Sequence, residues 1–184
     1  RSYHRIAGSN GMVRVSVMGV NSRGRALAMN FAKQQNGEVR HICDVDSRAI
    51  DKCINSVSEI QQAKPEAYGD FRKSLESNEI DALVIAAPDH WHAPAALLAI
   101  QAGKHVYVEK PSTHNMWEGR KMVEAARKYN TLMQVGFQNR SIVNTRRAMK
   151  YIHDGNLGKI YMARGLCFKP RADIGIYPDG PMKA

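Results

Sequence analysis

The stretch VRVSVMGVNSRG, residues 13–24, decides the fold predicted for this chain. Val13–Met18 is rich in valine and is typical of a buried strand, and the residues that follow Gly24 have helical apolar spacing. Gly19 and Gly24 occupy the outer positions of a G-x-G-x-x-G pattern, whose middle position is Asn21, a residue that tolerates positive φ. Between a strand and a helix, such a turn presents backbone N–H groups to phosphate, so the segment predicts dinucleotide binding.

An acidic residue, Asp44, follows the second predicted strand and lies 20 residues after Gly24. Its carboxylate could accept hydrogen bonds from both hydroxyls of a ribose, and it would repel a 2′-phosphate. We therefore predict NAD as the cofactor, while Arg48 nearby keeps NADP open. Asp46 is interpreted as a helix-start residue rather than a ligand, with Ser47 capping the helix. The structural alternative is an ordinary turn followed by an Asp helix cap.

Short apolar strands alternate with amphipathic helices through residue 136, which predicts an α/β fold with a doubly wound parallel sheet. Strands are expected at 13–18, 39–43, 82–86, 105–108 and 131–135, and helices at 23–35, 47–62, from 70, at 93–101, from 115 and at 144–153. A last strand is expected at Lys159–Leu166, with an exposed edge over Tyr161–Phe168. We expect an exposed tail over 1–11, a Rossmann domain over 12–141 and the start of an α+β domain over 142–184.

Composition excludes several other classes of protein. The most apolar stretch, 82–102, is interrupted by charged residues and prolines, so no membrane partner is predicted. The net charge is +10, but residues 1–102 carry 12 basic and 11 acidic side chains, against 15 and 6 in residues 103–184. The basic residues form no run and do not interleave with aromatic residues, so no nucleic-acid partner is predicted. The three cysteines lack disulfide or zinc spacing, and no metal site is predicted; Cys43 is interpreted as a buried apolar residue.

Polar residues gather after the later strands as well, and parallel strands bring such ends to one edge of the sheet. The segments are APDHWH after Ala86, EKP after Val108 and GFQNR after Val135. Lys110 is the most informative of these residues, because Pro111 restricts its backbone and a cation beside Glu109 could orient a substrate hydroxyl or hold a proton during hydride transfer. A solvated lysine in an exposed turn is the alternative.

Together these segments resemble the Gfo/Idh/MocA family of nicotinamide-dependent oxidoreductases. The resemblance rests on VRVSVMGVNSRG, CDVD, IDALVIAAPDHWH, AGKHVYVEKP and MQVGFQNRS in this order, between Val13 and Arg171. It implies a Rossmann domain followed by an α+β domain for substrate binding and oligomerisation. It also implies a set of cofactor-binding residues, with Lys110 in the catalytic network: Gly19, Asn21, Ser22, Arg23, Gly24, Asp44, Ala87, Pro88, His92, Glu109, Lys110, Gln138 and Arg140.

The activity implied is hydride transfer between nicotinamide and a sugar, polyol or related alcohol. Two alternatives remain: an NAD-dependent glycosidase of the same family, and a non-catalytic nucleotide-binding module. The family's catalytic histidine, in a second-domain segment, has no counterpart in this sequence, and Arg171 is expected near the active site. The subgroup resembled is often exported to the periplasm, so an exported protein is one expectation and a cytoplasmic one the other. A homo-oligomer formed through the second domain is expected.

Overall fold

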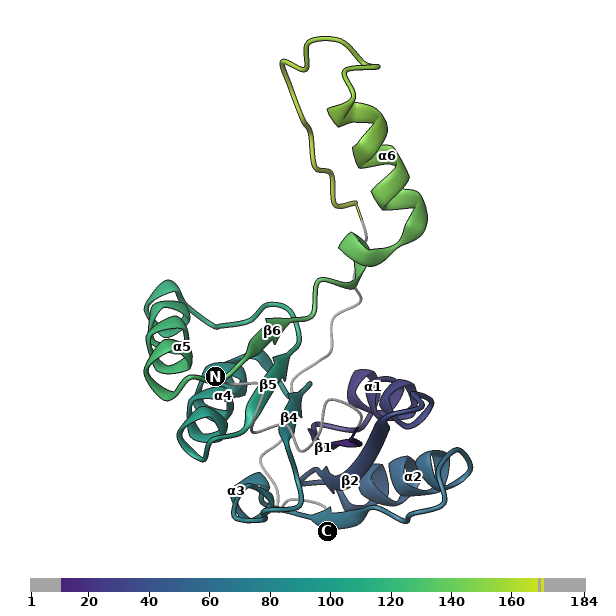
Figure 1. Ribbon diagram of the computed structural model, residues 1–184, viewed down its shortest axis with the longest axis vertical. Coiled ribbons are helices and arrows are strands. Elements are labelled where there is room, and N and C mark those ends of the chain that lie inside the picture. The colour runs from purple at the N-terminus through teal and green to yellow at the C-terminus, as the bar shows by residue number, and fades with distance from the viewer. Residues whose placement is uncertain (1–10, 169, 171–184) are drawn as a thin grey trace. The chain divides into compact units, whose positions relative to one another are not determined.

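Six parallel strands form the central sheet of the computed structural model, which describes residues 11–168 and 170 (Figure 1). The strands are β1 (Val13–Met18), β2 (Gly37–Cys43), β3 (Glu66–Tyr68), β4 (Ala82–Ile85), β5 (His105–Val108) and β6 (Met133–Val135). Their order across the sheet is β3-β2-β1-β4-β5-β6. The order reverses between β1 and β4, and this is where ligands bind in open α/β sheets.

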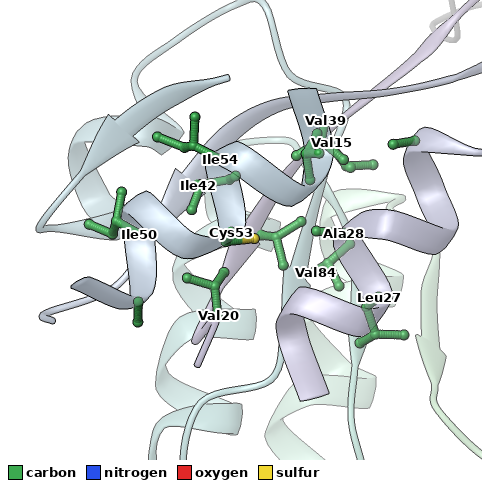
Figure 2. Close-up of a cluster of buried hydrophobic side chains, with 14 residues drawn as sticks. Val15, Val20, Leu27, Ala28, Val39, Ile42, Ile50, Cys53, Ile54 and Val84 are labelled. Carbon is green, nitrogen blue, oxygen red and sulfur yellow. The ribbon is translucent and has the colours of Figure 1, made fainter. Parts of the chain in front are cut away.

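Two helical layers cover the two faces of this sheet. Helices α1 (Arg23–Ala32) and α2 (Ser47–Ser58) pack against one buried cluster, which includes Val15, Val39, Ile42 and Val84 (Figure 2). The second cluster joins Leu83, Ile85 and Val106 to helices α3 (Phe71–Leu75), α4 (His92–Gln101) and α5 (Met116–Tyr129). This covering of both faces explains why the strands read as continuous apolar runs. The predicted doubly wound α/β sheet is confirmed.

Element boundaries differ from the predictions at a few points. Asp46, not Ser47, is the N-cap of α2: its carboxylate accepts a hydrogen bond from the Arg48 N–H over 3.0 Å. The interpretation of Asp46 as a helix-start residue is thus confirmed. Helices α1 and α2 end before the predicted residues 35 and 62. Strand β3 was not predicted, because three residues at a sheet edge carry too little pattern.

The described residues from Phe137 onward form a second compact unit. It contains the short 3-10 helix η2 (Gln138–Ser141) and helix α6 (Val143–His153). The strand predicted at Lys159–Leu166 is wrong: these residues are exposed and form no strand, since nothing in the described part of the chain pairs with them. The domain boundaries remain a prediction, and residues 1–10 and Arg171 lie outside the described residues.

Among the described residues, no helix combines the length and the apolar character that crossing a bilayer requires.

Candidate functional site

The turn after β1 holds two glycines that no other residue could replace without a shift of the backbone. Gly19 adopts a φ of +82°, and a Cβ built on it would lie 2.5 Å from the backbone nitrogen of Ala87. A Cβ on Gly24 would lie 2.0 Å from the carbonyl oxygen of Gly19. Both distances are far shorter than real Cβ contacts, so the turn brings the first turn of α1 directly against the ends of β1 and β4.

The start of α1 is arranged as an anion site. Ser22 is the N-cap, and its side chain makes no capping hydrogen bond, so it does not occupy the N–H groups of the first helical turn. Asn21, Ser22 and Arg23 are exposed. Backbone N–H groups at a helix N-terminus favour negatively charged ligands such as phosphate. Among the described residues, Asn130 is the one non-glycine residue with a positive φ. Asn21, at the middle position of the glycine pattern, therefore has a negative φ.

Asp44 lies at the end of β2, beside the glycine turn. One carboxylate oxygen accepts a hydrogen bond from the Val20 N–H over 2.7 Å, and the other accepts from the Asp46 N–H over 3.1 Å. These bonds fix the carboxylate and hold the turn after β1 against the end of β2. Arg48, which kept NADP open, is paired with Asp46 through two contacts of 3.0 and 2.9 Å between side chains.

A cavity of about 510 Å³ opens at this edge of the sheet, next to Asp44. Its lining comes from the ends of β1, β2 and β4, from the segment after β3, from the 3-10 helix η1 (Asp89–Trp91) and from α4: Met18, Gly19, Cys43, Asp44, Val45, Gly69, Asp70, Phe71, Arg72, Ala87, Pro88, Trp91 and Leu98. The rings of Phe71 and Trp91 meet edge to face, with centroids 6.3 Å apart. A mostly apolar slot beside a carboxylate suits a flat heterocycle attached to a ribose.

Sequence reasoning missed the wall formed by residues 69–72 and gave Trp91 no role. The segment after β3 carries no motif, and only the pairing of β3 with β2 brings it to the cavity. The position of Trp91 directly after the strand-end segment of β4 was the one available signal. Four predicted residues do line the cavity: Gly19, Asp44, Ala87 and Pro88.

Glu109, at the end of β5, is 5% exposed and pairs with a residue of the glycine turn. The Arg23 Nε donates to its Oε1 over 2.9 Å. Two residues that are 86 positions apart in the chain therefore meet at the same edge of the sheet. This contact links the predicted phosphate-binding turn to the predicted nicotinamide end of the site.

His92 is 2% exposed, and its ring nitrogens contact two backbone carbonyl oxygens. Nε2 lies 2.8 Å from the Ala87 oxygen, and Nδ1 contacts the Pro111 oxygen. The ring therefore joins the loop after β4 to the loop after β5. The direct contact of His92 with the cofactor stays a prediction.

Lys110 is exposed and follows Glu109 directly, and its peptide bond to Pro111 is cis. Its backbone N–H lies 3.4 Å from a carboxylate oxygen of Glu109. Gln138 and Arg140 belong to η2 of the second unit, where the Arg140 guanidinium lies 5.4 Å from the centre of the Phe137 ring. The roles of these three residues stay predictions.

A glycine turn after the first strand, a fixed carboxylate after the second and a cavity at the point where the strand order reverses define a dinucleotide-binding Rossmann protein. Residues 13–137 match the family GFO_IDH_MocA, described as an oxidoreductase family with an NAD-binding Rossmann fold. The chain belongs to this family, and its cofactor is NAD.

The curated relatives include proteins named for glycoside hydrolysis. The chain is 28% identical over 160 residues to a "Glycosyl hydrolase family 109 protein" from Saccharopolyspora erythraea, a match that covers 83% of this chain and 34% of that protein. A protein of the same name from Shewanella woodyi is 35% identical over 118 residues, which cover 62% of this chain and 25% of that protein. The matches thus span about a third and a quarter of the length of these two relatives.

Among solved structures, the myo-inositol 2-dehydrogenase of Lactobacillus plantarum superposes with a TM-score of 0.74 at 25% identity. That match covers 81% of this chain and 43% of the dehydrogenase.

Proposed function

We propose that this chain is the cofactor-binding part of an oxidoreductase that transfers hydride between nicotinamide and a polyol, sugar or related alcohol. The observation that carries the proposal is the juxtaposition of the glycine turn, Asp44 and the cavity at one edge of the sheet. The similarity to an inositol dehydrogenase supports a substrate with several hydroxyl groups. The chain matches only part of the length of its relatives. The substrate, the activity and the oligomeric state are therefore proposed for the whole protein.

Each residue of the edge has a distinct role in this proposal. The N–H groups at the start of α1 and the Arg23 guanidinium bind the pyrophosphate, and the Asp44 carboxylate accepts hydrogen bonds from the adenosine ribose. The apolar slot with Phe71 and Trp91 holds the adenine. Glu109 binds the nicotinamide ribose while Arg23 neutralises its charge.

Lys110 is proposed to act on the substrate. When bound, NAD supplies the hydride acceptor at its nicotinamide ring. Oxidation of an alcohol releases one hydride and one proton, so a basic group must hold the hydroxyl proton. The Lys110 ammonium can orient the hydroxyl by donating a hydrogen bond to its oxygen, and the neighbouring Glu109 carboxylate can accept its proton. Gln138 and Arg140 are proposed to lie near the nicotinamide.

The test of the oxidoreductase proposal is NADH formation by the protein at its natural length. With inositols, sugars and related alcohols offered in turn, absorbance at 340 nm should rise with at least one substrate. Lys110→Met should lower kcat strongly with little change in NAD affinity. Tight NAD binding with no NADH formed from any alcohol would contradict the proposal.

A second candidate is a glycosidase that uses NAD for a transient oxidation with no net redox change. The relatives named glycosyl hydrolase family 109, at 28 and 35% identity, favour it. Release of nitrophenol from aryl glycosides without accumulation of NADH would support this reading over the dehydrogenase.

A further inference from the structure

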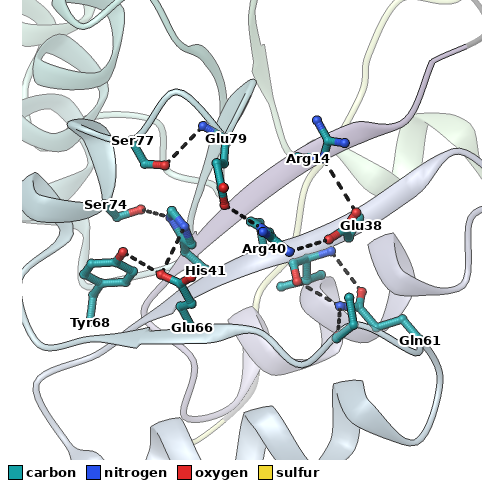
Figure 3. Close-up of polar contacts among 12 residues, drawn as sticks. Arg14, Glu38, Arg40, His41, Gln61, Glu66, Tyr68, Ser74, Ser77 and Glu79 are labelled. Atoms are coloured by element: carbon teal, nitrogen blue, oxygen red, sulfur yellow. Dashed lines mark hydrogen bonds and ion pairs between the residues drawn. The ribbon is translucent and has the colours of Figure 1, made fainter.

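Away from the cofactor edge, a buried histidine faces two glutamates at the outer side of the sheet (Figure 3). His41 lies on β2 and is 1% exposed. Glu66 is its register partner on β3, and Glu79 lies in the loop between α3 and β4. One ligand atom from each of these three residues lies within 4.8 Å of the other two. Nothing in the proposed function uses this cluster.

The hydrogen bonds around His41 determine which ring nitrogen faces the glutamates. Nδ1 lies 2.9 Å from the Ser74 hydroxyl, and that hydroxyl donates to Ser16 over 2.8 Å. Because Ser74 donates elsewhere, it accepts from the N–H at Nδ1 of a neutral ring. The Nε2 lone pair then points toward Glu66, whose nearest oxygen is 3.8 Å away, beyond hydrogen-bond distance. Among the described residues, no hydrogen bond reaches Nε2.

Burial favours this neutral form of the ring. His41 is 1% exposed, and a charged ring would be costly to bury at this position. A neutral imidazole held through its other nitrogen is the form in which histidine binds metals. The buried lone pair facing a carboxylate is unfavourable unless a cation lies between the two groups.

We propose that His41, Glu66 and Glu79 form a binding site for a transition-metal ion of the Zn²⁺ class. One imidazole nitrogen and two carboxylate oxygens form a three-ligand set that water can complete to a tetrahedron. Two ligand atoms of a tetrahedral zinc site lie about 3.3 Å apart, so ligand atoms within 4.8 Å of one another must approach by up to roughly 1.5 Å. Glu66 and Glu79 can do so because their side chains are 57 and 53% exposed.

Both glutamates already accept a hydrogen bond from a neighbouring side chain, and a bound ion would affect these two bonds differently. The Tyr68 hydroxyl donates to Glu66 over 2.8 Å, which orients that carboxylate from outside the site. The Arg40 Nε donates to Glu79 over 2.8 Å and lies where it competes with a bound cation. Arg40 also pairs with Glu38, so it keeps a partner when Glu79 turns toward the ion.

The sequence predicted no metal site, because it contains no CxxC pair and no cluster of cysteines and histidines with zinc spacing. The three residues are separated by 25 and 13 positions, and only the pairing of β2 with β3 and the path of the chain before β4 bring them together. A bound ion would join these three segments and hold the short edge strand β3 in place.

The test uses the full chain and ZnCl₂ alone, by calorimetric titration and thermal unfolding. Zinc in large excess over Kd should raise the Tm by about 5 °C, and Glu66→Gln with Glu79→Gln should abolish the rise. Both glutamates are exposed, so the double variant should fold. The matched control, Glu59→Gln with Glu76→Gln, removes two exposed carboxylates outside the cluster and should keep the rise.

A further variant, Arg40→Gln, gives an effect of the opposite sign. Removal of the competing guanidinium should tighten zinc binding several-fold. No binding of zinc by the natural chain, or binding that persists undiminished in the Glu66→Gln, Glu79→Gln variant, would overturn the proposal. In the first case, His41, Glu66 and Glu79 are neighbours that hold no ion; in the second, zinc binds elsewhere on the chain.

Discussion

Gly24 faces the carbonyl oxygen of Gly19 so closely that a Cβ at position 24 would lie 2.0 Å from that oxygen. This approach fixes the first turn of α1 against the end of β1. It is the geometric reason why a strand-turn-helix segment with these two glycines can present helix N–H groups to a phosphate.

Gly24→Ala should therefore damage both stability and cofactor binding. The backbone must shift to admit the methyl group, so we expect the free energy of unfolding to fall by about 1–3 kcal/mol. We expect NAD affinity to fall at least about tenfold, because the phosphate contacts move with the helix. Denaturant titration and calorimetry measure the two effects.

Gly119→Ala is the control for this substitution. Gly119 lies in helix α5, and a Cβ there would contact only the Thr113 side chain, at 3.6 Å. Since alanine favours a helix over glycine, unfolding should cost about 0.5–1 kcal/mol more, with NAD affinity unchanged. Equal losses in the two variants would contradict the special role of Gly24.

Asp44 and Asp46 should both favour NAD over NADP, each in a different way. Asp44→Asn removes the charge that faces the ribose and should weaken NAD binding about tenfold while favouring NADP. Asp46→Asn keeps a good helix cap but frees Arg48 from its pair, so NADP binding should tighten with little change for NAD. Titration of both nucleotides into both variants measures this, and an unchanged preference in both would refute the assignment of the ribose site.

His92 should support the site through its two loops. His92→Ala removes the buried ring that contacts the carbonyl oxygens of Ala87 and Pro111, and loss of its hydrogen bonding should cost about 1–3 kcal/mol in total. We expect lower stability together with weaker NAD binding. His90→Ala is the control: His90 is 62% exposed and should change stability by less than about 0.5 kcal/mol. If His92→Ala were as mild as His90→Ala, the link between the loops would not matter.

The three thiols should differ sharply in reactivity. Burial raises the pKa of Cys43 to about 12 and that of Cys53 to about 11, whereas Cys167 is exposed. Because the thiolate is the reactive form, one thiol should react with Ellman's reagent at pH 8 in the native chain and three after denaturation. The folded pKa values lie above the ordinary 9.0, so the stability from the buried thiols is complete below pH 9 and is lost as pH rises toward 11–12. Rapid native reaction of all three thiols would contradict the buried placement.

The local sequence pattern predicted most strands of the sheet but a smaller share of the residues that line the candidate site. Strands Val13–Met18 and His105–Val108 have the predicted boundaries, since both are rich in the β-branched and aromatic residues that favour strands. The residues 69–72 and the His41 cluster could not be found this way, because strand pairing alone brings them to their partners. The strand expected at Lys159–Leu166 shows the converse limit: an apolar run becomes a strand only where another strand pairs with it.

The most direct test of the central claim is a calorimetric titration of the purified chain with NAD⁺, and separately with NADP⁺. If the edge formed by the glycine turn and Asp44 is the cofactor site, NAD⁺ should bind with a stoichiometry of about one and more tightly than NADP⁺. Asp44→Asn should reduce that preference. A folded chain that binds neither nucleotide, or binds NAD⁺ equally well without the Asp44 carboxylate, would contradict the account.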